Sequence, residues 1–423
     1  MKRILLSLIR ERKQTTMKII DGGVTAPQGF KAASCAANIK YENREDMALI
    51  YSEDVCKVAG TFTRNVVKAA PVIWDRNIVN NNIGVQAIVV NSGIANACTG
   101  DEGISMCIKT AQAASSALHI PYEGVLVAST GVIGMQIPMD KIKNGINAMV
   151  PKLSYDNDAA HGAAKAIMTT DTIPKEAVVS VEIGGKEVVI GGMSKGSGMI
   201  HPNMCTMLAF VSSDVNISEE MLGKALSIVV EDTYNMISVD GDTSTNDTCL
   251  LLANGRAGND IIDSEGPDFD AFTEALFEVN RTLAKMMAGD GEGANALFEV
   301  KVVGADNVAN AKTLAKSVVT SSLTKAAIYG HDANWGRILC ALGYAGVDFD
   351  PENVDLYFES KAGKLQIVSK GVSTGYSEEE ATKILSEDAV TAICDMHMGD
   401  AKATAWGCDL THEYVSINAD YRS

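Results

Sequence analysis

The sequence predicts an α/β protein in which mixed sheets and helices are arranged in layers. Short β-branched and apolar runs, some joined in pairs by two- or three-residue turns, are typical of strands and hairpins. Longer segments with apolar residues every three or four positions lie between them and indicate amphipathic helices. Because hairpins and helices intermix along the chain, we expect mixed sheets with helices outside, not a purely parallel doubly wound sheet.

The first half of the chain is expected to contain short strands, three helices and one hairpin. In order, we predict strands and loops over residues 29–79, a buried strand over 85–90, a helix ending near 118, a strand over 125–128, helices over 139–149 and 157–168, and a hairpin of residues 178–183 and 186–190. Asp158 lies near the start of its helix, where the dipole favours a negative charge. Gly184-Gly185 is typical of a two-residue hairpin turn.

The second half repeats this mixture. In order, we predict a helix over 218–236, a strand over 247–252, a helix over 269–288, a strand over 296–303, a helix over 311–325, a hairpin of 356–360 and 364–369, a helix over 377–396 and a last strand over 414–418. Phe272, Leu276, Val279 and Leu283 have helical spacing. The glutamates that follow Ser377 form a capping box.

Composition excludes several function classes. A net charge of −17 argues against nucleic acid and anionic membrane as partners, because both require clustered Lys and Arg. The nine cysteines include no C-x-x-C pair, which favours reduced thiols over a disulfide framework. The six histidines show no metal-binding spacing, so we expect no metal site.

The first sixteen residues are expected to be a disordered N-terminal extension. Their short apolar run is followed by Arg10-Glu11-Arg12-Lys13 rather than by small residues, which rejects a signal peptide. No apolar stretch in the sequence approaches the roughly 20 residues of a membrane span. We therefore expect a cytoplasmic protein.

The strongest chemical signal lies in residues 193–211. A glycine-rich loop, Lys195-Gly196-Ser197-Gly198, leads toward an apolar strand, and Thr206 stands where the strand begins. This arrangement is typical of self-cleaving hydrolases and transferases. The threonine Oγ attacks the carbonyl before it, water opens the resulting ester, and the freed α-amine (pKa roughly 7.7–8) then serves as base for the hydroxyl. On spacing alone, a glycine loop before an ordinary core strand is the more frequent arrangement.

The segment K-G-S-G-M-I-H-P-N-M-C-T-M-L-A-F resembles the self-cleavage signature of the ornithine acetyltransferases, bifunctional enzymes of arginine biosynthesis. Cys205 replaces the alanine that normally precedes the nucleophile, and the resemblance extends over roughly residues 19–423. It implies the self-cleaving N-terminal-threonine-nucleophile fold. It also implies cleavage between Cys205 and Thr206 into an α chain (17–205) and a β chain (206–423), which associate as two of each.

The resemblance also implies the site residues. Thr130 and Gly131, in S-T-G-V-I-G after a strand, match the family's oxyanion hole, and Thr206 is the catalytic nucleophile. Thr169, with Thr170 as the alternative, and Lys195 are expected to bind substrate. Read without the family, these residues would be a strand-ending turn, a helix-end cap and a solvated lysine.

Three further substrate contacts are expected from the second half of the chain. Glu292 lies in G-E-G-A, where its carboxylate is placed to pair with a substrate ammonium, although Asn295-Ala296 replaces the family's Thr-Lys. Asn418 and Ser423 come from the C-terminal segment I-N-A-D-Y-R-S, which resembles the family ending. Without the family, Glu292 would be a solvated turn residue and the last residues would be frayed.

The function implied is transfer of acetyl from N2-acetyl-L-ornithine to L-glutamate by a ping-pong reaction. The acyl group is carried on Thr206, so no metal or cofactor is expected, and acetyl-CoA as an additional acetyl donor is left open. One alternative is a related self-processing aminopeptidase or amidohydrolase, in which water replaces glutamate. Another is a non-catalytic phosphate cradle at the glycine loop, which lacks the lysine and Ser/Thr spacing of a P-loop.

Overall fold

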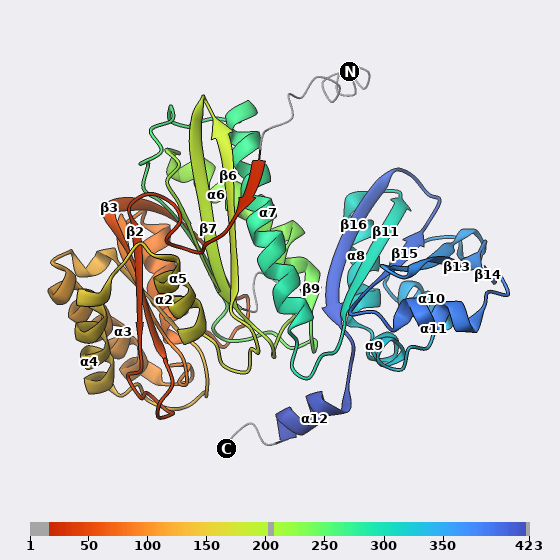
Figure 1. The fold of residues 1–423 in the computed structure, drawn as a ribbon, viewed down its shortest axis with the longest axis horizontal. Coiled ribbons are helices and arrows are strands. Elements are labelled where there is room, and N and C mark those ends of the chain that lie inside the picture. The colour runs from red at the N-terminus through yellow and green to blue at the C-terminus, as the bar shows by residue number, and fades with distance from the viewer. Residues whose placement is uncertain (1–16, 202–206, 420–423) are drawn as a thin grey trace.

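In the computed structural model, residues 17–201 and 207–419 are described, and their strands form two mixed sheets (Figure 1). The nine-stranded sheet contains, in order, β1 (Met17–Ile20), β6 (Lys175–Ile183), β7 (Lys186–Lys195), β8 (Leu208–Ser213), β10 (Thr248–Ala253), β3 (Met47–Phe62), β4 (Val85–Asn91) and β5 (Val125–Ser129), with β2 (Phe30–Cys35) paired to β3. The seven-stranded sheet contains, in order, β14 (Val372–Ser373), β13 (Gly363–Ser369), β12 (Asp355–Ser360), β15 (Ala389–Asp395), β11 (Leu297–Ala305), β16 (Ala401–Cys408) and β9 (Ile237–Ser238). The predicted mixed α/β class is confirmed.

Helices cover these sheets. They are α2 (Ala70–Asn80), α3 (Gly100–Leu118), α4 (Met139–Met149), α5 (Asn157–Ala166), α6 (Glu219–Asp232), α7 (Pro267–Gly289), α8 (Val308–Thr320), α9 (Ser322–Tyr329), α10 (Trp335–Gly343), α11 (Glu378–Leu385) and α12 (His412–Ala419). None of the helices in the described ranges has the length and apolarity needed to cross a membrane.

Helix α7 is the central element of the core. It packs against β6 and β7 of one sheet and against β11 and β16 of the other, and Figure 1 shows it between the two. Phe272, Leu276, Val279 and Leu283 are all fully buried, as their spacing predicted. Burial of a side chain of this size stabilises the fold by roughly 1.5–3 kcal/mol, so α7 joins the two sheets through one continuous hydrophobic core.

The segment before and after the predicted cleavage site forms adjacent strands. β7 and β8 are antiparallel, with Lys195 opposite Leu208, and β8 runs parallel to β10. The predicted hairpin of β6 and β7 is confirmed, and Gly184 and Gly185 both have positive φ. The nine-stranded sheet thus takes strands from both sides of the Cys205–Thr206 bond, which itself lies outside the described residues.

Two predicted helices are wrong. The helix expected over 311–325 is two helices, because Ser321 has an extended conformation and its hydroxyl caps α9 by accepting from the Thr324 N–H. The helix expected over 377–396 ends with α11 at Leu385, and residues 389–395 are strand β15, in which Val390, Ala392 and Cys394 alternate as buried residues between β11 and β12.

Two further predictions need correction. The last strand, expected over 414–418, is helix α12, which has no buried residue among those described and therefore shows neither a strand nor a core-helix pattern. The interval 29–79, expected to hold strands and loops, also contains α2, which begins directly after Ala69 with Pro71 in its first turn. Proline is accepted there because the first helical N–H groups have no partner within the helix.

Candidate active site

A cavity of about 340 Å³ lies where β5, β7, β8 and the segment before β10 come together. Of the predicted site residues, six line it: Thr130, Gly131, Thr169, Lys195, Glu292 and Asn418. Thr170, the alternative to Thr169, lines it as well, so the structure brings both to the same wall. Met207 and Leu208 also form part of the lining. Thr206, Cys205 and Ser423 lie outside the described residues.

Thr130 and Gly131 follow β5 at a point where only glycine fits. Gly131 has φ +129°, and a Cβ there would lie 2.3 Å from the carbonyl carbon of Gly93. The N–H of Thr130 donates to the Asn91 carbonyl at 3.0 Å. Both residues line the cavity, and the Thr130 hydroxyl lies within reach of Lys195 Nζ.

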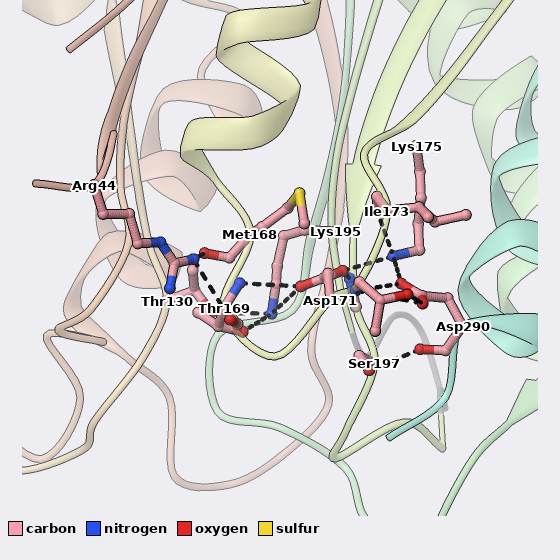
Figure 2. Close-up of polar contacts among 12 residues, drawn as sticks. Arg44, Thr130, Met168, Thr169, Asp171, Ile173, Lys175, Lys195, Ser197 and Asp290 are labelled. Atoms are coloured by element: carbon pink, nitrogen blue, oxygen red, sulfur yellow. Dashed lines mark hydrogen bonds and ion pairs between the residues drawn. The ribbon is translucent and has the colours of Figure 1, made fainter. Parts of the chain in front are cut away.

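Lys195, the last residue of β7, connects the two threonines. Its Nζ lies 2.9 Å from Thr169 Oγ1 and 3.4 Å from Thr130 Oγ1 (Figure 2). Burial lowers the pKa of Lys195, and the nearby Asp171 carboxylate opposes this effect. Lys195 is therefore a buried lysine that contacts two hydroxyls, not the solvated loop residue that its sequence position alone suggested.

Asp171 stands behind Lys195, and the sequence analysis did not identify it as a site residue. Its carboxylate accepts hydrogen bonds from Lys175 Nζ at 2.7 Å, the Gly196 N–H at 2.6 Å and the Thr169 N–H at 3.1 Å. Burial alone would raise the pKa of this carboxyl, but Lys195 and Lys175 hold it well below its ordinary value. Asp171 is therefore ionised although fully buried.

Arg44 also contacts the backbone that carries Thr169, on the side away from Asp171. The Arg44 guanidinium donates to the Met168 carbonyl and, at 3.4 Å, to the Thr169 carbonyl, and Figure 2 shows it reaching this turn from a separate part of the chain. No sequence pattern links Arg44 to residues 168–169, so only the structure identifies this contact.

Glu292 is buried rather than solvated. Its N–H donates to the Ser197 carbonyl at 2.9 Å, and a Cβ added to Gly198 would lie 2.3–2.4 Å from its carboxyl atoms. The glycine loop therefore allows the backbone to pass directly over this carboxylate. Asn418 Nδ2 donates to Glu292 Oε2 at 2.7 Å, so the otherwise exposed helix α12 supplies one side of the site.

Asn246 lines the cavity and is another residue that the sequence did not identify. Its Nδ2 donates to the Ala95 carbonyl at 2.6 Å and the Ser129 carbonyl at 2.8 Å, which fixes the end of β5 beside the segment that precedes β10. The polar run D-T-S-T-N-D-T before an apolar strand was the available signal. The departure at Asn295-Ala296 has a simple local role, because both N–H groups donate to the Asp409 carboxylate.

The chain is similar in sequence to proteins of one family over nearly its whole length. The sequence model of the ArgJ family matches residues 31–423. The arginine biosynthesis bifunctional protein ArgJ of Thermotoga neapolitana is 50% identical over 398 residues, which cover 94% of this chain and 99% of that protein. The ArgJ 1 protein of Clostridium acetobutylicum is 50% identical over 410 residues, covering 96% of this chain and 100% of that protein. A crystal structure of ArgJ from Bacillus halodurans is 46% identical, with a TM-score of 0.49, and covers 51% of this chain and 99% of that one. With a family match over nearly its whole length and half of its residues identical to full-length relatives, the chain belongs to the ArgJ family.

Proposed function

We propose that this enzyme transfers the acetyl group of N2-acetyl-L-ornithine to L-glutamate in arginine biosynthesis, by way of an acetyl ester on Thr206. The observation that carries the proposal is the convergence on one cavity of residues from distant segments. Thr130, Lys195, Glu292 and Asn418 line the same space as Met207, the neighbour of Thr206 in the chain.

The nucleophile is generated by the chain itself. Cleavage between Cys205 and Thr206 frees the Thr206 α-amine, which takes the proton of its own hydroxyl as Oγ attacks the acetyl carbonyl. The tetrahedral intermediate then breaks its carbon–nitrogen bond, and the departing α-amine of ornithine receives that proton. In the second half-reaction, the α-amine of glutamate attacks the ester and Thr206 Oγ leaves with a proton.

Thr130 and Gly131 provide the oxyanion hole in this mechanism. The Thr130 hydroxyl accepts a hydrogen bond from Lys195 at 3.4 Å, which polarises the hydroxyl as a donor toward the developing negative charge. Loss of one such donor typically lowers kcat by roughly 10²–10³-fold. The close approach of Gly131 to Gly93 fixes the direction of the Gly131 N–H.

The two ends of the cavity suit the charges of an amino-acid substrate. Lys195 and the Thr169 hydroxyl form a cationic and polar end suited to the substrate carboxylate. Glu292, oriented by Asn418, forms an anionic end suited to the side-chain ammonium of ornithine. Because both charged groups are buried, their attraction for these partners is weakly screened by salt.

The acetyl group is carried on the chain, so the proposed reaction requires no metal or organic cofactor. Acetyl-CoA serves the same mechanism as an alternative acetyl donor, since its thioester presents the same acetyl carbonyl to Thr206. In this proposal the α and β chains stay associated, because the nine-stranded sheet contains strands from both. The assembly of two of each is what the family resemblance implies.

Acetyl transfer and self-cleavage can be tested together. Incubation with N2-acetyl-L-ornithine should release ornithine continuously and form N-acetylglutamate only when L-glutamate is present. The Thr206→Ala variant should stay a single polypeptide by intact mass and lose at least about 10⁴-fold of the transfer rate. Thr206→Ser is the matched control and should retain cleavage and part of the activity. Equal ornithine release without glutamate would favour a hydrolase instead, and full activity of Thr206→Ala would overturn the proposal.

A further inference from the structure

Four buried charged side chains of alternating sign extend away from the cavity. Lys195 Nζ lies 3.8 Å from Asp171 Oδ2, Lys175 Nζ lies 2.7 Å from Asp171 Oδ1, and Lys175 Nζ lies 2.6 Å from Asp290 Oδ2. The side chains of Lys175 and Asp171 are fully buried, and those of Asp290 and Lys195 are at most 10% exposed. Figure 2 shows Asp171 between the two lysines, with Asp290 beyond Lys175.

At the cationic end of the cavity, Asp171 contacts Lys195 and the backbone of two neighbouring residues. Beside its contacts with Lys175 and Lys195, its carboxylate accepts the Thr169 N–H and the Gly196 N–H. Thr169 and Lys195, which contact each other at this end, therefore both contact the same carboxylate. Displacement of Asp171 would move both.

At the other end, Asp290 holds the loop that carries Glu292. Its carboxylate accepts from the Thr172 N–H at 3.1 Å and from the Thr172 hydroxyl, and its carbonyl accepts from Ser197 Oγ at 2.7 Å. Glu292 follows two residues later and donates its N–H to the Ser197 carbonyl. The separation between the cationic and anionic ends of the cavity is thus set by this chain of ion pairs.

We propose that Asp171 is the positioning residue of this site: it directs the Lys195 side chain at Thr130 and Thr169, and through Lys175 and Asp290 it fixes the anionic end at a matching distance. This inference rests on the proposed acetyl transfer, for which it adds a residue that need not touch the substrate. Lys175 and Asp290 serve it as the connection between the two ends.

The charges that face Lys195 make the role of Asp171 measurable. Asp171, from the turn before β6, raises the pKa of Lys195, and so do Glu292, after α7, and Asp247, before β10. Lys175, on β6, lowers the pKa of Lys195, in the same direction as burial. Removal of Asp171 and removal of Lys175 should therefore move the titration of Lys195 in opposite directions.

Two variants test this opposition. Asp171→Asn keeps the shape and one hydrogen-bond acceptor, and the double variant Lys175→Met/Asp290→Asn removes an ion pair without changing net charge. For the fraction with a cleaved Thr206 N-terminus, kcat/KM should be measured against pH. Asp171→Asn should lower kcat/KM roughly 100-fold. It should also move the alkaline limb to lower pH by about one unit or more, whereas the double variant should move that limb to higher pH.

Asp75→Asn is the matched control, because Asp75 is also a buried aspartate but is not among the residues that line the cavity, and it should leave kcat/KM and both limbs unchanged. Alkaline limbs that stay in place, or that move the same way in both variants, would overturn the positioning role. If the wild-type enzyme transferred no acetyl group, the proposed function would fail instead. The pKa of Lys195, followed by NMR of labelled lysine side chains, would then decide the positioning role by the same opposite shifts. That titration also serves if Asp171→Asn is not cleaved.

Discussion

Asp171 and Asp75 are both buried aspartates, but the two regions of the molecule give their carboxyl groups different partners. Asp171 lies beside the cavity, with Lys175 at 2.7 Å and Lys195 at 3.8 Å. Asp75 lies on α2 and is 1% exposed. Its Oδ1 accepts from the Val127 N–H at 2.9 Å, while its Oδ2 has no hydrogen-bond partner among the described residues.

The charge states of the two aspartates differ accordingly. Burial raises the pKa of Asp75 well above its ordinary value, because only one N–H opposes the loss of solvation. Burial acts in the same direction on Asp171, yet the two lysines reverse it. Burial therefore penalises ionisation in both regions, and neighbouring cations decide whether the group is charged. Beside the cavity, Lys175 and Lys195 supply those cations for Asp171.

The largest expected effect comes from removal of the cation that Asp171 and Asp290 share. Lys175→Met leaves two carboxylates buried with one ammonium fewer, which should lower the free energy of unfolding by about 3–5 kcal/mol. Urea denaturation in the uncut Thr206→Ala background should measure this loss, because unfolding there involves a single chain. A loss below about 1 kcal/mol would contradict the buried network, since that is the range of exposed pairs.

The pH dependence of this loss follows from the sign of the shift. The folded-state pKa of Asp171 is depressed, so its contribution to stability is present above the unfolded pKa of roughly 3.9 and is lost as the pH falls below it. The difference between wild type and Lys175→Met should therefore shrink in acid. Addition of Asp290→Asn to Lys175→Met should recover part of the loss at neutral pH, because one uncompensated carboxylate is removed.

A smaller effect of opposite sign is expected at Asp75. The folded-state pKa is raised, so unfolding at neutral pH is favoured by ionisation of the unfolded carboxyl. Asp75→Asn should stabilise the fold at pH 7, because it removes this ionisation from the unfolded state. The gain should vanish below pH roughly 4, where the carboxyl is protonated in both states. The same urea series against pH measures it, and a destabilised variant at pH 7 would indicate an ionised Asp75.

The parts of the fold that sequence predicted well are those fixed by local pattern. The hairpin of β6 and β7, the helix Met139–Met149 and the central helix α7 agree with prediction because their turn residues and apolar spacing act within one segment. The strand Ala389–Asp395 was predicted as helix because its capping signal at Ser377 was genuine. Its strand state is set by pairing with β11 and β12, which no local pattern reveals.

The site divides in the same way. Lys195, Thr130 and Glu292 were predicted from motifs that resemble a family, and the structure brings them to one cavity. Asp171, Lys175 and Asp290 were missed as a network because the contact between Lys175 and Asp290 joins residues 115 positions apart. Lys175 begins strand β6, four residues after Asp171, and none of the sequence motifs that predicted the site includes it.

The smallest effect should come from an ion-pair network at the surface, which tests whether burial is what separates Asp171 from an ordinary salt bridge. Glu53 contacts Lys31 at 2.8 Å and Arg256 at 2.8 Å, and its side chain is 29% exposed. The hydrogen bond from Lys31 leads the contacts that lower the pKa of Glu53 to about 2. Because solvent screens these charges, Glu53→Gln should lower the free energy of unfolding by no more than about 1 kcal/mol.

This loss should be present above the unfolded pKa of roughly 4.3, fade as the pH falls toward 2, and shrink in about 0.5 M salt. The loss from Lys175→Met should persist at the same salt concentration, since Asp171 is fully buried and Asp290 is only 6% exposed. Equal salt sensitivity in the two variants would mean that water reaches the Asp171–Lys175 pair. Burial would then not distinguish the ion pairs of Asp171 from those of an exposed carboxylate such as Glu53.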